Sequence, residues 1–216
     1  MNARLPLSDP RRLRAALAAC ALSALALAGC AVTRTTPVKG TFLLNPTAPA
    51  AVARPQQGTL RVEGVNVAAP FRGKSFVFRE SELKYETDYY NEFIVAPAAN
   101  IGEATARGLQ RAGAFTRVMA PGAPADADWV LEGFVTALYG DARDASKPPA
   151  AELAITYYLS RADGGFGVPV WSRDYAQRVP LAASTAAAYA AALNSALGQI
   201  VADLARDLAA AELPKR

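Results

Sequence analysis

The order of strand-like and helix-like segments predicts an α+β fold: a single two-layer domain in which a mixed or antiparallel sheet packs against two helices. Two observations carry this prediction. Several strand-like runs precede each helix, so the chain lacks the strand–helix alternation of a parallel βαβ fold. The last helix also carries an unbroken apolar stripe, which needs a surface to cover it. The predicted domain, residues 59–213, has ~150 residues, enough for one hydrophobic core without disulfides.

The first half of this domain predicts strands and then a helix. Residues 60–67 favour a strand with a bend, and residues 75–79 and 83–87 favour a hairpin across a polar turn. A helix is expected over residues 98–112, because Pro97 suits a first helical turn and Gly113 suits a helix end. A short strand is expected over residues 115–119. The inner face of the helix is predicted to be Ile101, Thr105, Leu109 and Ala112.

The second half predicts three strands followed by a long helix. Residues 129–139 alternate, and residues 153–161 and 168–178 predict a hairpin. The expected helix covers residues 184–211, with Ser184 or Thr185 as its cap. One face of the first strand is predicted to hold Trp129, Leu131, Gly133, Val135 and Ala137. The apolar stripe of the helix is Tyr189, Leu193, Leu197, Ile200, Leu204 and Leu208. Packing on the protein's own sheet is the preferred interpretation of this stripe, and a coiled coil with a partner is the alternative.

The N-terminus has the pattern of a secretory signal. Four arginines precede an apolar run over residues 15–27, which is shorter than the ~20 residues that span a bilayer. The sequence Leu27-Ala28-Gly29-Cys30 follows and resembles the lipobox of bacterial lipoproteins. Residues 1–29 are therefore predicted to be a lipoprotein signal peptide, and Cys30 is predicted to be acylated and to hold the chain on a membrane.

Residues 30–58 are expected to form the lipidated N-terminus and a Pro- and Ala-rich linker. Residues 41–44 could be a strand, whereas Pro46, Pro49 and Pro55 interrupt the stretch that follows. Such a stretch cannot bury enough apolar surface to fold alone. Two interpretations stay open for residues 45–58: a flexible linker, or an edge segment that returns to the body.

Composition excludes several functions. Residues 1–29 hold four arginines and one aspartate, so they account for +3 of the net charge of +4, and nucleic acid is not an expected partner. The sequence contains no histidine, which excludes a Ser-His-Asp triad and a His-ligated metal. It also lacks the glycine-rich patterns of nucleotide-binding loops. We therefore expect no catalytic site, no metal and no cofactor.

Several short motifs, in their order along the chain, resemble the ABC-type transport auxiliary lipoprotein component family. These motifs are the lipobox, Phe42-Leu43-Leu44, Leu60-Arg61-Val62, Phe76-Val77-Phe78-Arg79, Leu83-Lys84-Tyr85 and Tyr89-Tyr90-Asn91-Glu92-Phe93-Ile94-Val95-Ala96-Pro97. The resemblance covers nearly all of the chain after the signal peptide. Some members have a tryptophan just before the last proline motif, and because this chain has none there, no role of that residue is carried over.

The resemblance implies a non-catalytic role in transport. Members of the family accompany an ATPase, a permease and a substrate-binding protein with a mammalian-cell-entry (MCE) domain. Such systems move phospholipid or other hydrophobic molecules between the inner and outer membranes. The resemblance places the lipoprotein on the periplasmic face of the outer membrane, and Ala31 after the lipidated cysteine agrees with that sorting. Assembly into a homo-oligomer stays open. The alternative function is an outer-membrane assembly or activator lipoprotein that docks a periplasmic envelope complex.

Five residues are candidates for partner binding. Tyr85, Tyr89, Tyr90 and Phe93 are expected to form an exposed aromatic surface for a lipid, a neighbouring subunit or the MCE protein. A half-buried strand uses the same residue types, so a structural role is equally open. Arg79 either holds the hairpin by pairing with a carboxylate such as Glu82, which is the preferred interpretation, or faces a partner.

Overall fold

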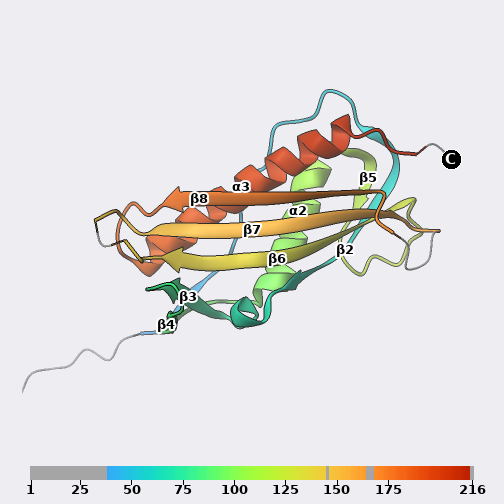
Figure 1. The fold of residues 1–216 in the computed structure, drawn as a ribbon. Coiled ribbons are helices and arrows are strands. Elements are labelled where there is room, and N and C mark those ends of the chain that lie inside the picture. Colours follow the sequence, from blue (N-terminus) through green and yellow to red (C-terminus); the bar gives the residue numbers. More distant parts are fainter. Residues whose placement is uncertain (1–37, 145, 164–167, 215–216) are drawn as a thin grey trace, which may run out of the picture. The chain divides into compact units, whose positions relative to one another are not determined.

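The structure is a computed structural model that describes residues 38–144, 146–163 and 168–214. The predicted signal peptide and Cys30 lie outside the described residues. In the described part, eight strands form one sheet and two α-helices cover one of its faces (Figure 1). The predicted α+β class, with a mixed sheet and two helices, is confirmed.

The elements have the following bounds. The strands are β1 Gly40–Phe42, β2 Gln56–Val67, β3 Ser75–Arg79, β4 Tyr85–Phe93, β5 Phe115–Met119, β6 Trp129–Asp141, β7 Ala150–Arg161 and β8 Trp171–Pro180. The helices are the 3-10 helix η1 Ala69–Phe71 and the α-helices α2 Pro97–Ala112 and α3 Ala186–Ala210.

Strand β6 is the centre of the sheet. On one side it pairs antiparallel with β7 from Trp129↔Arg161 to Asp141↔Ala150, and β7 pairs with the edge strand β8. On the other side it pairs in parallel with β2 up to Val135 and with β3 at Gly140 and Asp141. The sheet therefore forks, because β2 continues to β5 whereas β3 continues to β4 and then to β1.

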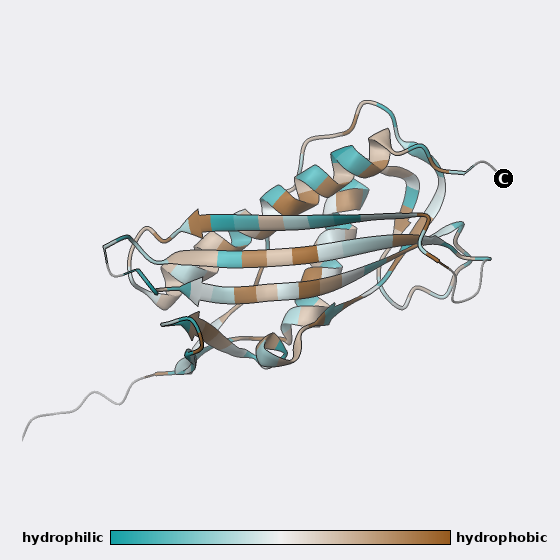
Figure 2. Cartoon of the chain, in the orientation of Figure 1, coloured by the Kyte–Doolittle hydropathy of each residue, from teal (hydrophilic) through white to brown (hydrophobic). Residues whose placement is uncertain are grey.

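Both helices bury their apolar faces against the sheet. Helix α2 packs on β2 and β5, and α3 packs on β7 and β8. The six predicted stripe residues of α3 and the four predicted inner residues of α2 are all fully buried, which confirms both faces. Hydrophobic and hydrophilic segments alternate along α3 in Figure 2, as expected for an amphipathic helix. Neither helix is long and apolar enough to cross a membrane.

The helix ends follow the predicted chemistry. Pro97 lies in the first turn of α2, and Gly113 ends it in the left-handed conformation at φ 64°. The Thr185 hydroxyl accepts a hydrogen bond of 3.2 Å from the Ala188 N–H and caps α3. A Cβ atom at Gly108 would lie 2.4 Å from Val201 Cγ1, so a larger residue at this contact between α2 and α3 would require Val201 to shift.

The segment between β1 and β2 is part of the folded body. Buried Asn100 on α2 binds both backbone groups of Leu44, with Leu44 N to Oδ1 and Nδ2 to Leu44 O each at 2.8 Å. The N–H of Val52 donates to Ala112 O at 2.8 Å, and β2 begins at Gln56, four residues before the predicted strand. The mobile-linker interpretation is therefore wrong for residues 45–58, and the alternative of a segment that returns to the body agrees with these contacts. Side-chain amides such as that of Asn100 provide hydrogen bonds to backbone groups in this segment, where the prolines have no N–H to donate.

Two of the differences between the predicted and observed strands affect the residues considered below. Strand β4 extends to Phe93 instead of ending at residue 87. In β6 the pairing shifts between Val135 and Ala137, so Leu138 is buried in place of the predicted Ala137. This is the expected effect of a β-bulge, because one additional residue moves every later side chain to the opposite face.

We expect Asn100→Leu to release the segment after β1. The substitution leaves the N–H and C=O of Leu44 without partners, which costs ~1–3 kcal/mol. Amide hydrogen exchange read by mass spectrometry should become tenfold or more faster over residues 44–52. In the matched control Asn194→Ala only the Asn45 N–H loses its acceptor. Unchanged exchange in Asn100→Leu would show that the segment is held by other contacts.

Phenylalanine substitutions at two buried tyrosines should change the stability of the protein in opposite directions. The Tyr189 hydroxyl is fully buried and has no hydrogen-bond partner among the described residues, whereas the Tyr157 hydroxyl shares a bond of 2.8 Å with Thr105 Oγ1. Tyr189→Phe should raise the free energy of unfolding by ~1 kcal/mol, since it removes an unsatisfied polar group. Tyr157→Phe should lower it by a similar amount. Urea unfolding measures both, and a destabilised Tyr189→Phe would contradict the assignment.

Candidate functional site

A wide bulge in β4 decides where the candidate aromatic residues lie. Ser75 pairs with Glu92 and Val77 pairs with Thr87, so residues 88–91 lie opposite a single residue of β3. The Asp88 carboxylate holds this bulge by accepting from the N–H groups of Tyr90 at 2.8 Å and Asn91 at 3.0 Å. Two consecutive tyrosines therefore reach the surface together instead of pointing to opposite faces.

Tyr89 and Tyr90 form an exposed pair. Tyr89 is 77% exposed and Tyr90 is 43% exposed, and their rings contact edge to face with centroids 5.1 Å apart. Lys39 Nζ lies 5.9 Å from the centroid of Tyr89 and 3.4 Å from the carboxylate of Glu92. These two tyrosines are thus available to an external ligand, as the sequence predicts for part of its aromatic surface.

Arg79 and Tyr85 belong to a second cluster at the base of the β3–β4 turn. Arg79 donates to the carboxylate of Glu82 at 3.0 Å and to its backbone oxygen at 2.8 Å, so the pairing expected of Arg79 is present. Its guanidinium lies 5.4 Å from the centroid of Tyr85, which also contacts the rings of Phe71 and Tyr139. Tyr85 remains 41% exposed, whereas Leu83 in the turn is 94% exposed.

Phe93 lies in the core. It is only 2% exposed, and its ring packs edge to face on Phe76 at 4.8 Å, which in turn contacts Tyr189 of α3. Its prediction as part of an exposed aromatic surface is therefore wrong. The bulge shifts the phase of β4, so the first apolar side chain after it returns to the helices. A carboxylate at Asp88 placed to bond the next two N–H groups was the available signal.

Sequence reasoning missed a network of charged groups centred on Asp141. The nearly buried Asp141 carboxylate accepts from Arg143 Nε at 2.9 Å and from Arg178 Nη1 at 2.7 Å. Arg143 also pairs with Glu82 at 2.6 Å, and Arg178 pairs with Glu152. The hydrogen bonds from Arg143, and then those from Arg178, hold the pKa of Asp141 well below its ordinary value. The network joins the β3–β4 turn to β6, β7 and β8.

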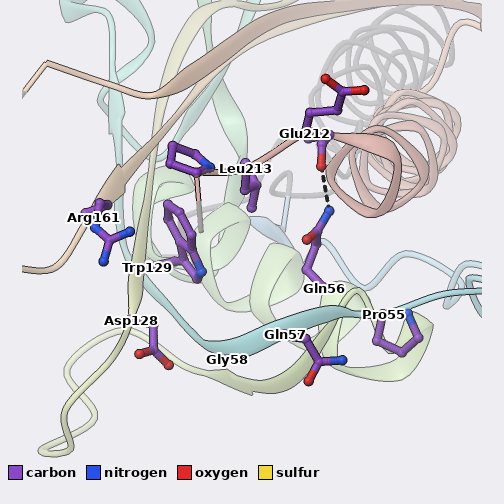
Figure 3. Close-up of a pocket in the computed structure, with 11 residues that line it drawn as sticks. Pro55, Gln56, Gln57, Gly58, Asp128, Trp129, Arg161, Glu212 and Leu213 are labelled. Atoms are coloured by element: carbon purple, nitrogen blue, oxygen red, sulfur yellow. Dashed lines mark hydrogen bonds between the residues drawn. The ribbon is translucent and has the colours of Figure 1, made fainter. Parts of the chain in front are cut away.

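A pocket of about 760 Å³ lies at the opposite end of β6. Trp129 and Leu213 give it an apolar wall, and the guanidinium of Arg161 lies 5.4 Å from the Trp129 ring centroid (Figure 3). Gln56 closes one side, because its amide donates to the carbonyl groups of Leu208, Ala209 and Ala211 at the end of α3. Its size and mixed lining suit a small amphiphilic molecule. In the described part of the chain no group of acidic or sulfur side chains is arranged to hold a metal.

Comparisons with known proteins identify a family and a fold. Residues 42–205 match a family model described as the ABC-type transport auxiliary lipoprotein component. The fold resembles the crystal structure of protein XCC0632 from Xanthomonas campestris, assigned there to DUF330, with a TM-score of 0.68 at 19% identity over 76% of this chain and 91% of that one. A second crystal structure of an uncharacterized protein gives a TM-score of 0.62 at 18% identity over 79% and 99% of the two chains.

The dodecameric PelC from Paraburkholderia phytofirmans is a more distant structural match. Its TM-score is 0.38 at 15% identity, over 72% of this chain and 93% of that one. A comparison with curated protein sequences finds no significant match.

The Asp141 network predicts a pH-dependent contribution to stability. Asp141→Asn should lower the free energy of unfolding by ~1.5–3 kcal/mol at neutral pH, the range for hydrogen bonds to a charged group. Because the pKa of Asp141 is lowered on folding, its stabilisation is complete above the unfolded pKa of ~4 and is lost as pH falls towards the folded value. The difference between wild type and variant should therefore shrink below pH ~4.

Urea unfolding over a series of pH values measures this difference. Asp144→Asn is the control, since Asp144 is exposed and its ion pair with Lys147 lies at the solvent-accessible surface. Its removal should change stability little at any pH. A difference for Asp141→Asn that is independent of pH would contradict the role given to its charge.

Proposed function

The chain belongs to the ABC-type transport auxiliary lipoprotein component family, and from this premise we propose that it is a non-catalytic lipoprotein of the outer membrane. In this proposal it serves an ABC system with an MCE-domain protein that moves phospholipid or another hydrophobic molecule between the two membranes. The observation that carries the proposal is the family match, which extends from β1 into α3.

Acylation of Cys30 is the proposed means of attachment. It is supported by the charged and then apolar N-terminal segment and by the lipobox-like Leu27-Ala28-Gly29-Cys30. The absence of aspartate at position 31 supports sorting to the outer membrane, with the folded domain on the periplasmic face.

A binding role without catalysis agrees with how the charged groups are used. The sequence contains no histidine. Asp141 is the buried acidic side chain of the described residues; it is bound to two arginines and does not line the pocket. The charged groups around it join neighbouring strands to one another, which agrees with a rigid binding domain.

We place the partner-binding surface at the turn between β3 and β4. Leu83 is almost fully exposed there, and Tyr85 presents part of its ring beside it. Four ring or guanidinium contacts hold this surface in place, so a partner would meet a pre-organised surface. The MCE-domain protein is the proposed partner, and the permease and ATPase belong to the same system. Docking of another envelope complex, as an assembly or activator lipoprotein, is the alternative function.

Co-purification from solubilised membranes tests the proposal. Leu83→Asp should reduce recovery of the MCE-domain protein tenfold or more, as expected when an interface anchor worth about 1.4 kcal/mol or more is lost. Tyr85→Ser should act in the same direction. The matched control is Tyr158→Ser, which removes a tyrosine of similar exposure, 36%, from β7. Thermal melts confirm that each variant is folded.

Two outcomes would contradict the proposal at different levels. Full recovery with folded Leu83→Asp and Tyr85→Ser would place the interface elsewhere on the domain. Failure of the wild type to co-purify with any MCE-domain protein would favour the assembly-factor alternative instead.

A further inference from the structure

Exposed apolar side chains gather along the edge formed by β1 and β4. Six of the twelve exposed large hydrophobic residues in the described part of the chain lie there. We propose that this surface, which we term the β1–β4 edge, rests on the lipid bilayer that holds the acyl chains of Cys30. The inference rests on the proposed anchor and adds to it a second, non-covalent membrane contact. The six residues are Val38, Leu43, Tyr89, Tyr90, Ile94 and Val95.

Strand pairing makes these residues one continuous surface. β1 and β4 run in parallel with Gly40 opposite Asn91 and Phe42 opposite Phe93. The N–H of Ile94 also donates to Phe42 O at 2.8 Å, which continues the pairing by one residue. Leu43 is therefore beside Ile94 at one end, and Val38 precedes the paired stretch at the end where Tyr89 lies. β1 is an edge strand of the sheet, and no described strand other than β4 pairs with it.

The length of the tether keeps this edge at the membrane. Val38 is eight residues after Cys30, and eight residues span at most ~29 Å when fully extended. The pairing of β1 with β4 from Gly40 onward makes the tether this short, and Asn100 holds Leu44 immediately after β1. A linker extending to residue 58 would let the domain turn freely, whereas this one enters the fold at the apolar edge itself.

The chemistry of the edge suits a bilayer interface. Tyrosine rings place an apolar body and a polar hydroxyl across the boundary between lipid and water, and aliphatic side chains beside them enter the acyl region. The formal charges around the edge balance, because Lys39 and Lys74 are matched in number by Asp88 and Glu92, and Lys39 pairs directly with Glu92. Burial of apolar area rather than attraction to anionic headgroups should therefore provide the contact.

The experiment uses the mature, acylated protein in vesicles. Cys20 leaves with the signal peptide and Cys30 is acylated, so a new cysteine is the one free thiol available for labelling. Tyr89→Cys and Ile94→Cys are labelled with an environment-sensitive fluorophore, and Tyr158→Cys on β7 is the matched control. Vesicles contain phosphatidylcholine, with or without nitroxide-labelled lipid as a quencher and with or without phosphatidylglycerol.

Quenching at positions 89 and 94 should be at least threefold greater than at position 158. It should be the same on zwitterionic and anionic vesicles, since the charges of the edge cancel. Equal quenching at all three positions would overturn the inference. A spectral shift at positions 89 and 94 that increases with protein concentration and needs no lipid would overturn it in favour of contact between copies of the chain.

A separate measurement distinguishes failure of this inference from failure of the proposed anchor. The mass of the purified mature chain shows whether Cys30 carries acyl chains. If it does not, the anchor is wrong, and a Cys30→Ala chain held on nickel-chelating vesicles by an N-terminal histidine tag still tests the edge. Absence of quenching at position 89 in that setting would overturn the membrane contact on its own.

Discussion

Strand β6 changes its neighbour half-way along its length, and the whole arrangement depends on this change. Its first part pairs with β2, and its last two residues pair with β3. The bulge after Val135 lies where the pairing of β6 with β2 ends. Directly after β2, the N–H of Ala68 donates a hydrogen bond to the carbonyl oxygen of Val135. Gly140 is required where β3 joins, because a Cβ atom there would lie 2.5 Å from the Phe78 ring. One long strand thus supports two arms that do not pair with each other directly.

The strands β3, β4 and β1, which carry the candidate surfaces, are consequently joined to β6 by few backbone hydrogen bonds. β3 pairs with β6 at two positions, so the β3–β4–β1 arm needs further contacts to be rigid. The Asp141 network supplies some of them by joining Glu82 in the turn to strands β6, β7 and β8 through two arginines. Aromatic packing of Phe76 and Phe78 on Tyr189 supplies the rest from the helix side. Polar contacts at the β3–β4 turn and apolar contacts on the helix side therefore both hold this part of the sheet.

Sequence predicted what depends on local periodicity and missed what depends on distant partners. The α3 stripe, the α2 face and both helix ends follow from spacing and capping chemistry, which are visible within a few residues. Asn100 gave no local sign that it would bind Leu44, since its role appears only when residues 56 positions apart meet. Asp141 was missed for the same reason, because the arginine of β8 that binds it is 37 residues away. Phe93 was misplaced because alternation assumes no bulge, and Asp88 introduces one.

The two proposed contacts lie on one strand pair, and this has a mechanical consequence. In these proposals Leu83 and Tyr85 at the turn face a partner, while the exposed residues Tyr89, Tyr90, Ile94 and Val95 face the bilayer. All of them belong to the β3–β4 hairpin or to the residues directly after it. Strand residues advance ~3.3 Å each, so a protein docked at the turn would be held within a few nanometres of the lipid surface. With a flexible linker, the distance between the docked partner and the membrane would vary. A subunit that receives a hydrophobic molecule from a transport system needs its partner close to the membrane, because the cargo must not cross water. The docked N-terminal segment and the bulge in β4 are the two features that make this geometry available.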